Sequence, residues 1–273
     1  MKKKLFTLLT LTVFTLSSWA EDGHRLWLPA QKSQTAHVST NAQSATIDLA
    51  KQELTDYFAG TKATLLIDPA LTDDEGFTIN GNEDSVVVRA RRDIGLLYGA
   101  YDVLRRQATQ GNMNHVEQHP RFRLRMLNHW DNLDGSIERG YAGESIFEWF
   151  HLDEALLHQY ARANASIGIN GSVLNNVNAS PKMLTREYLD EVRKIADLLR
   201  PYGIRVYLSI NFATPMALGD THTADPKNKR VRQWWKRKAK EIYSIIPDFG
   251  GFLVKANSEG QPGPGDYHRT HAE

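Results

Sequence analysis

The pattern of apolar and polar positions divides the chain into two stretches with different rhythms. In the first stretch, residues 45–58 and 94–104 each place apolar side chains three or four positions apart, which predicts two amphipathic helices. Short runs rich in apolar and β-branched residues predict three β-strands, at residues 64–67, 76–79 and 85–90. We therefore expect a small α/β domain over residues 21–118, in which the polar segment 107–120 is the linker to the second stretch.

The second stretch alternates strand patterns with helix patterns. Strands are predicted at residues 123–129, 171–175, 205–212 and 251–256, and helices over 185–199 and 231–246 and in a segment ending at 160–165. This alternation indicates parallel strands joined by right-handed crossovers, and four such units are half of a (β/α)8 barrel. We expect residues 119–273 to be the first four β/α units of a TIM-barrel domain, truncated in the loop after the fourth strand.

The first 20 residues have the three sections of a secretory signal peptide. Three lysines at positions 2–4 precede an apolar stretch, and small residues at Ser18 and Ala20 precede the expected cut. The apolar stretch, residues 5–16, is too short for a membrane anchor, because a spanning helix needs roughly 20 apolar residues. The mature protein is therefore expected to be exported, to the periplasm or outside the cell, with no integral membrane segment.

Composition narrows the classes of chemistry. The chain has 273 residues, of which 41% are hydrophobic and 24% charged, as in globular proteins. A net charge of +1 gives no reason to expect nucleic acid as a partner. The absence of cysteine excludes disulfides, thiol nucleophiles and cysteine-ligated metals, the histidines lack metal-ligand spacing, and no nucleotide-binding motif is present. We expect neither a metal nor a cofactor.

All four strands of the second stretch are predicted to end in polar residues. In parallel barrels the catalytic residues lie at the carboxyl ends of strands. These ends are residues 128–132, 175–178, 209–211 and 255–259. Turn chemistry explains part of this pattern, because asparagine is common where strands end. Four coincident polar ends nevertheless favour a functional site.

The fourth strand carries the most informative pair, Lys255 and Glu259. Side chains alternate along a strand, so Leu253 and Lys255 share one face, and a continued pleat would add Asn257 and Glu259 to it. A simple ion pair would explain the two charges, but a lysine inside a barrel is costly unless it has a task. Lys255 could bind an anionic substrate, and Glu259 near apolar walls could act as a general acid.

The tryptophans have different predicted roles. Trp130 follows the first strand and has polar neighbours, so we interpret it as an aromatic wall for a sugar, although tryptophan is more often part of a core. Trp235 is expected on the buried face of the helix over 231–246, with the basic residues 236–240 on the solvated face. This basic run is therefore not interpreted as a nucleic-acid site.

Several segments together resemble one known family. They are residues 128–132 (Asn-His-Trp-Asp-Asn), 138–143, 163–171, 175–179 (Asn-Asn-Val-Asn-Ala), 200–204, 208–212, 247–256 and 258–264 (Ser-Glu-Gly-Gln-Pro-Gly-Pro). In these segments the chain resembles the microbial α-glucuronidases of glycoside hydrolase family 67, almost without a break from about residue 121 to 273. The first domain is similar to the family's N-terminal α/β domain, a fold that is shared with hexosaminidases.

The resemblance implies a reaction and a set of residue roles. The family removes glucuronic acid, or its 4-O-methyl ether, from an α-1,2 bond to the terminal xylose of xylooligosaccharides, with inversion. It implies that Glu259 is the general acid, Lys255 contacts the uronate carboxylate, Trp130 forms an aromatic wall of the sugar pocket, and Val177 contacts the 4-substituent. It also implies glucuronosyl-substituted xylooligosaccharides as the partner, no cofactor, and a possible homodimer of the full-length protein.

Inversion requires a second carboxylate, roughly 6.5–9.5 Å from the acid, to activate water. The resemblance places this base beyond residue 273, and Asp131 has no feature that supports such a role. Two alternatives stay open. One is a hexosaminidase-like retaining hydrolase, although the Asp-Glu pair expected after the fourth strand is replaced by Ser258-Glu259. The other is a non-catalytic sugar-binding protein that uses Trp130 and Lys255.

Overall fold

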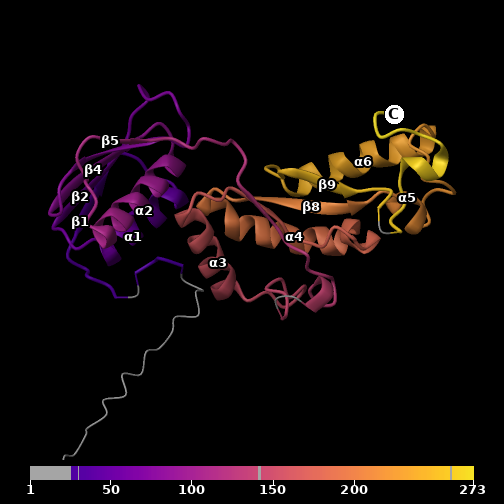
Figure 1. Ribbon diagram of the computed structural model, residues 1–273, viewed down its shortest axis with the longest axis horizontal. Helices are drawn as coiled ribbons and strands as arrows, with labels where there is room; N and C mark the ends of the chain where they lie inside the picture. The colour runs from indigo at the N-terminus through magenta and orange to yellow at the C-terminus, as the bar shows by residue number, and fades with distance from the viewer. Residues whose placement is uncertain (1–25, 30, 141–142, 259) are drawn as a thin grey trace, which may run out of the picture.

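The computed structural model describes residues 26–29, 31–140, 143–258 and 260–273, which form two adjacent units, each a β-sheet with helices (Figure 1). The first unit lies at the indigo-to-magenta end of the ribbon, and the second unit runs from magenta through orange to yellow. The predicted signal peptide, residues 1–20, lies outside the described residues. Among those that are described, no helix has the length and hydrophobicity needed to cross a bilayer.

The first unit contains a five-stranded mixed sheet of order β1-β2-β4-β3-β5. Its strands are β1 (His37–Thr40), β2 (Lys62–Ile67), β3 (Phe77–Gly81), β4 (Ser85–Ala90) and β5 (Val116–Gln118). Strands β1, β2 and β4 run parallel, whereas β3 is antiparallel to both of its neighbours. Helices α1 (Ala45–Tyr57) and α2 (Asp93–Thr109) pack against each other on one face of this sheet (Figure 1).

The structure confirms the two helices and the three strands expected in this unit, but the prediction of a linker over residues 107–120 is wrong in part. Helix α2 continues to Thr109, and β5 pairs with β3. Strand β1 was not predicted at all. Both missed strands are short and carry few apolar residues, so their backbone pairing and not their side-chain pattern defines them.

Helix α2 packs closely against strand β4 in the first unit. Val86, Val88 and Ala90 alternate along β4 and are almost completely buried. A Cβ added at Gly99 of α2 would lie 2.4 Å from Val88 Cγ1, so only glycine lets the helix approach this closely. At the helix starts, Ser44 Oγ accepts a hydrogen bond from Ile47 N and donates one to Asp93, which ties the start of α1 to that of α2.

The second unit is a sheet of four parallel strands in the order β6-β7-β8-β9. The strands are β6 (Met126–Asn128), β7 (Gly171–Val173), β8 (Arg205–Asn211) and β9 (Gly251–Lys255). The helices are α3 (Glu154–Ser166), α4 (Arg186–Leu199), α5 (Thr214–Ala217) and α6 (Lys229–Ile245), with short 3₁₀ helices η1 (Glu138–Gly140), η2 (Pro181–Leu184), η3 (Arg200–Tyr202) and η4 (Pro264–Tyr267). The expected alternation of parallel strands and helices is confirmed, although β6 and β7 are shorter than predicted.

The packing of α6 differs in part from the prediction. The helix begins at Lys229 and buries Trp234, which is 5% exposed, whereas Trp235 is only partly buried. The buried tryptophan donates its indole N–H to Asp220. Trp235 packs against the core as expected but is less buried than Trp234, because neighbours on a helix differ by about 100° and both border the apolar face.

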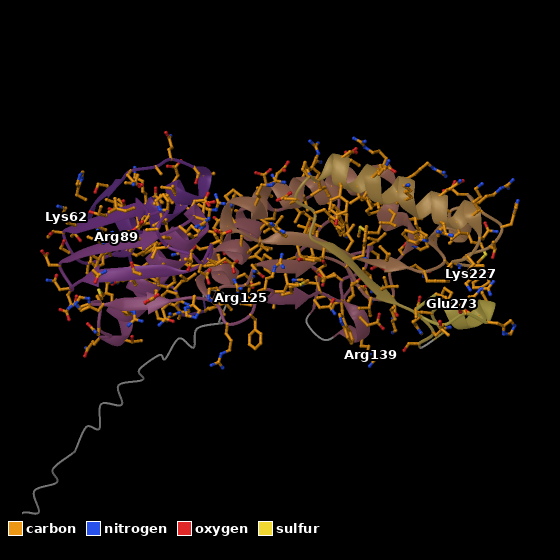
Figure 2. All side chains as sticks on the ribbon, turned by 90° about the horizontal axis from the view of Figure 1, so that it is seen from above. Lys62, Arg89, Arg125, Arg139, Lys227 and Glu273 are labelled. Atoms are coloured by element: carbon orange, nitrogen blue, oxygen red, sulfur yellow. The ribbon has the colours of Figure 1, made fainter. Side chains whose placement is uncertain are left out.

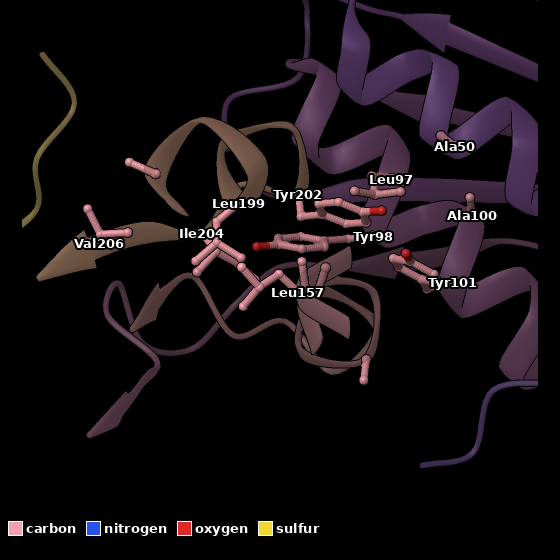
Figure 3. Close-up of a cluster of buried hydrophobic side chains, with 14 of the residues drawn as sticks. Ala50, Leu97, Tyr98, Ala100, Tyr101, Leu157, Leu199, Tyr202, Ile204 and Val206 are labelled. Carbon is pink, nitrogen blue, oxygen red and sulfur yellow. The ribbon is translucent and has the colours of Figure 1, made fainter. Parts of the chain in front are cut away.

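The two units share one continuous core (Figure 3). Tyr98 of α2, Tyr202 of η3 and Leu157 of α3 all belong to it. A buried ion pair joins the units at the same interface, because Arg162 of α3 donates two hydrogen bonds to the Glu53 carboxylate of α1. The Arg162 guanidinium also lies 4.8 Å from the centre of the Tyr57 ring.

Candidate active site

The carboxyl ends of β6–β9 lie along one edge of the second sheet, because the four strands are parallel (Figure 1). We call this the carboxyl edge. Trp130 lies two residues beyond the end of β6, Val177 four residues beyond the end of β7, and Lys255 is the last residue of β9. The structure thus places these three predicted site residues at a common edge. Glu259, the predicted general acid, lies outside the described residues.

Lys255 reaches from one side of this edge to the other. Its Nζ donates a hydrogen bond of 3.0 Å to Asn178 Oδ1, in the segment after β7. Strand β8 lies between β7 and β9, so this bond spans the strand between them. Lys255 is paired in register with Asn211, and side chains paired in a parallel sheet share a face. The ammonium group is therefore positioned over the end of the sheet and is half-buried.

Asn176 is the most connected residue of the carboxyl edge. It is 2% exposed, and its Nδ2 donates to Asn132 Oδ1 at 2.9 Å and to Glu138 Oε2 at 2.6 Å. Its Oδ1 accepts from the backbone N–H of Asn178 at 2.9 Å, and its own backbone N–H donates to the Asp131 carbonyl. These bonds connect the segment after β6 to the segment after β7.

The adjacent residue, Asn175, has a different role. It is also 2% exposed, but both polar atoms of its side-chain amide are hydrogen-bonded to the Ser209 backbone. Its Nδ2 donates to the Ser209 carbonyl, and its Oδ1 accepts from the Ser209 N–H. Asn175 therefore joins the segment after β7 to β8 through the Ser209 backbone. The Ser209 hydroxyl is buried without a hydrogen-bond partner among the described residues.

Trp130 presents part of its ring to solvent, with 36% of the residue exposed, and its two neighbours are both anchored. His129 Nε2 lies 2.8 Å from the Tyr160 hydroxyl, and burial raises the pKa of that hydroxyl to about 12. Asp131 is 4% exposed, and its Oδ2 accepts from Ser145 Oγ at 2.5 Å. The Trp130 carbonyl itself accepts from Glu138 N. The backbone at Trp130 is thus fixed, while its ring is accessible.

Both carboxylate oxygens of Asp131 lie close to neighbouring side chains. Besides the bond to Ser145, its Oδ1 lies 3.5 Å from His129 Nδ1. A carboxylate that is buried and held in this way orients its neighbours and is poorly placed to activate a water molecule. The structure therefore adds no reason to assign Asp131 as the catalytic base.

The expected continuation of the β9 pleat is wrong at Asn257. This residue has a φ of 53°, in the left-handed region, so the extended backbone ends at Lys255. Its side chain turns toward the following loop, where Oδ1 accepts from Gly265 N at 2.9 Å. The period-two argument that placed Asn257 and Glu259 on the face of Lys255 therefore does not extend beyond the strand.

Two cavities of different character adjoin the second sheet. One, of about 440 Å³, opens at the carboxyl edge and is lined mostly by residues with polar side chains, among them Asn132, Asn175, Asn176, Asn178 and Lys182. A larger one, of about 970 Å³, lies at the opposite ends of the strands, between the two units, and includes Arg92, Arg121, Arg200, Asp74 and Asp248. The predicted site residues Trp130, Val177 and Lys255 line neither of these two cavities. Across the described residues, no group of three or more histidine and carboxylate side chains could hold a metal ion.

Sequence comparison finds relatives over most of the chain. Residues 104–273 match the model of the glycosyl hydrolase family 67 middle domain. The chain is similar to proteins named "Probable alpha-glucuronidase A" from Aspergillus fumigatus, with 47% identity over 74% of this chain and 24% of that protein, and from Aspergillus clavatus, with 37% identity over 99% of this chain and 37% of that protein. It is 46% identical to "Alpha-glucuronidase A" of Emericella nidulans over 75% of this chain and 25% of that protein. The chain thus spans between 24% and 37% of the length of these relatives.

Comparison with solved structures supports the fold. A GH138 enzyme targeting pectin rhamnogalacturonan II aligns with a TM-score of 0.56 and 16% identity over 80% of this chain and 30% of its own. An inactive mutant of the GH20 exo-β-N-acetylglucosaminidase from Vibrio harveyi aligns with a TM-score of 0.52 and 14% identity over 78% of this chain and 42% of its own. At these identities the likeness concerns only the path of the backbone.

Proposed function

The chain belongs to glycoside hydrolase family 67, and on this premise we propose that it is part of an exported α-glucuronidase. The enzyme would hydrolyse the α-1,2 bond between glucuronic acid, or its 4-O-methyl ether, and the terminal xylose of xylooligosaccharides. The observation that carries this proposal is the grouping of an ammonium, an accessible indole and an apolar side chain at one edge of a parallel sheet. That set matches the chemistry of an anionic sugar.

Each of the three groups has a separate role in the proposed site. Lys255 would donate a charge-assisted hydrogen bond to the uronate carboxylate, which a neutral sugar lacks. Trp130 would pack against the apolar face of the sugar ring. Val177, between the anchored Asn176 and Asn178, would contact the substituent at the 4-position.

The proposed reaction proceeds with inversion. Glu259 would protonate the glycosidic oxygen as xylose leaves, and a carboxylate beyond residue 273 would activate a water on the opposite face of the sugar. Protonation of the leaving group is the step that a general acid must supply, because an alkoxide of a sugar is a poor leaving group.

Four consecutive parallel strands with intervening helices support the further proposal that residues 119–273 are half of a (β/α)8 barrel, preceded by a separate domain over residues 21–118. We also propose a cleaved signal peptide over residues 1–20 and, for the full-length protein, a homodimer. Mass spectrometry of the exported protein would test the cleavage, with an N-terminus at Glu21 expected and an intact Met1 contradicting it.

The activity is tested by incubating the full-length protein with glucuronosyl-xylotriose and following the anomeric protons by NMR. Release of glucuronic acid, first as the β-anomer, is expected from inversion of an α-linkage. The α-anomer as first product would contradict the proposed mechanism. Release of N-acetylhexosamine from a chitobiose substrate instead would favour the retaining alternative. Binding of the uronic acid without any cleavage would favour a non-catalytic sugar-binding protein.

A further inference from the structure

We propose that Asn176 is a positioning residue. It couples the segment after β6, which contains Trp130, to the hydrogen bond between Asn178 and Lys255. The coupling itself follows from the hydrogen bonds of the carboxyl edge. Its consequence for turnover rests on the proposed function, because only there do Trp130 and Lys255 contact a substrate.

The first half of the coupling runs through the amide nitrogen of Asn176. This nitrogen donates to Asn132 Oδ1 and to Glu138 Oε2, and both acceptors belong to the segment after β6. Glu138 in turn donates its backbone N–H to the Trp130 carbonyl at 2.9 Å. The position of Trp130 therefore depends on a contact that Asn176 makes to Glu138.

The second half runs through the amide oxygen of Asn176. It accepts the backbone N–H of Asn178 and so fixes a short turn that contains Val177. The Asn178 side chain then accepts the hydrogen bond from Lys255 Nζ at 3.0 Å. One buried amide thus holds the turn at Val177 directly, Trp130 through Glu138, and Lys255 through Asn178.

Only an amide meets these demands at this position. Both ends of the Asn176 side chain form hydrogen bonds. Its NH2 group donates to two oxygens, and its amide oxygen accepts one backbone N–H. An aspartate of the same size would keep the acceptor but would lose both donors. It would also place its carboxylate where the amide nitrogen now lies 2.6 Å from the Glu138 carboxylate.

The test uses Asn176→Asp, Glu138→Gln and the double variant, and measures hydrogen exchange of the whole chain by mass spectrometry. In Asn176→Asp, peptides covering residues 131–140 are expected to exchange about tenfold faster. The reason is that this variant loses the hydrogen bonds that connect the segment after β6 to residue 176. The double variant restores a donor opposite the new carboxylate, so exchange should return to within about threefold of the wild type. If Asn176→Asp fails to fold, Glu138→Ala removes the same contact from a half-buried position and must accelerate exchange in the same peptides.

Asn175→Asp is the matched control, because it makes the same chemical change at an adjacent residue with the same 2% exposure. Its contacts are to the Ser209 backbone, so it should lower the temperature of unfolding without accelerating exchange over residues 131–140. Equal acceleration by both Asp variants would overturn the proposal, since the effect would then be a general loss of stability. So would unchanged exchange in Asn176→Asp, or a double variant that exchanges no more slowly than the single one.

Turnover separates this inference from the proposed function. With glucuronosyl-xylotriose and the full-length enzyme, Asn176→Asp should lower kcat/KM about tenfold, and Glu138→Gln added to it should recover most of the loss. Accelerated exchange with unchanged kcat/KM would overturn the link to the substrate contacts. Absence of glucuronic acid release by the wild type would instead refute the proposed function, while the exchange data would still decide whether Asn176 couples the two segments.

Discussion

The two sheets of this protein differ in the kind of side chain that they bury. Among the described residues, those that are both buried and polar and lie in strands or just after them belong to the second sheet, for example Asp131, Asn176 and Ser209. The strands of the first sheet bury apolar side chains instead, such as Leu65 and Val88. A buried polar group without a partner costs about 1–3 kcal/mol, so a fold gains nothing from such groups unless they are hydrogen-bonded or used. The difference agrees with the proposal that the site lies at the second sheet, while the first sheet has an apolar core.

The largest effect is expected from Glu259→Gln, which tests the proposed role of this residue as the general acid. Removing a general acid typically lowers turnover about 10²–10⁴-fold, and the loss should be smaller for substrates with good leaving groups. The kcat values of the full-length protein for glucuronosyl-xylotriose and for an aryl glucuronide provide the measurement. Equal losses on the two substrates would contradict the role as an acid.

A core substitution in the first region should produce the opposite pattern. Leu65 of β2 is fully buried, so Leu65→Ala should lower the free energy of unfolding by about 2–5 kcal/mol. Turnover measured well below the unfolding temperature should be unchanged, because this residue lies in the other sheet. Denaturant unfolding followed by circular dichroism gives the first quantity. A specific fall in kcat at full folding would show that the two regions are not divided as described.

Lys255→Met should lower kcat/KM for a glucuronosyl substrate about ten- to hundredfold, which corresponds to the loss of a hydrogen bond between charged groups. The methionine keeps most of the aliphatic stem, so the unfolding temperature should change little. A glucosyl-substituted substrate is the control, since it lacks the carboxylate and should be insensitive to the change. Equal losses on both substrates would refute the proposed contact to the uronate.

The smallest effect, on the unfolding temperature, is expected from breaking the ion pair between Arg200 and Asp248 at the amino end of the second sheet. Burial opposes ionisation of Asp248, but hydrogen bonds from the Arg200 guanidinium outweigh it and lower the pKa of this carboxyl. The stability from a lowered pKa is present above the unfolded value of about 4 and is lost as the pH falls through the folded value. Asp248→Asn should therefore cost at most about 1 kcal/mol at pH 7, and this cost should shrink as the pH falls below about 4. Unfolding temperatures measured across this range check the sign, and a larger cost in acid would contradict it.

Most of the fold follows from the sequence where side-chain pattern and burial agree. Strand β4 was predicted with its observed bounds, because Val86 and Val88 alternate with half-buried residues and pair on both sides. Strand β5 and strand β1 were missed since their identity depends on pairing with distant backbone. The deeper burial of Trp234 than of Trp235 was missed for a different reason. When two adjacent residues of a helix are both apolar, the sequence does not show which of them faces the core more directly.

The candidate site was predictable only in part. Lys255 and Trp130 stood out because a lysine in a strand and a tryptophan among polar residues are unusual. Asn176 did not, because an asparagine after a strand is typical of a turn and its contacts lie 38 and 44 residues away in the sequence. The left-handed backbone of Asn257 was likewise hidden, since period two describes a strand but does not say where the strand stops.

The most direct test of the central claim is the location of bound sugar in a crystal of the full-length protein soaked with glucuronic acid. Figure 2 labels one residue on each side of β6, because Arg125 directly precedes this strand and Arg139 follows it in η1. We expect the sugar carboxylate within hydrogen-bonding distance of Lys255 Nζ and the ring against Trp130. Sugar bound only in the cavity of about 970 Å³ at the amino ends of the strands would contradict the account.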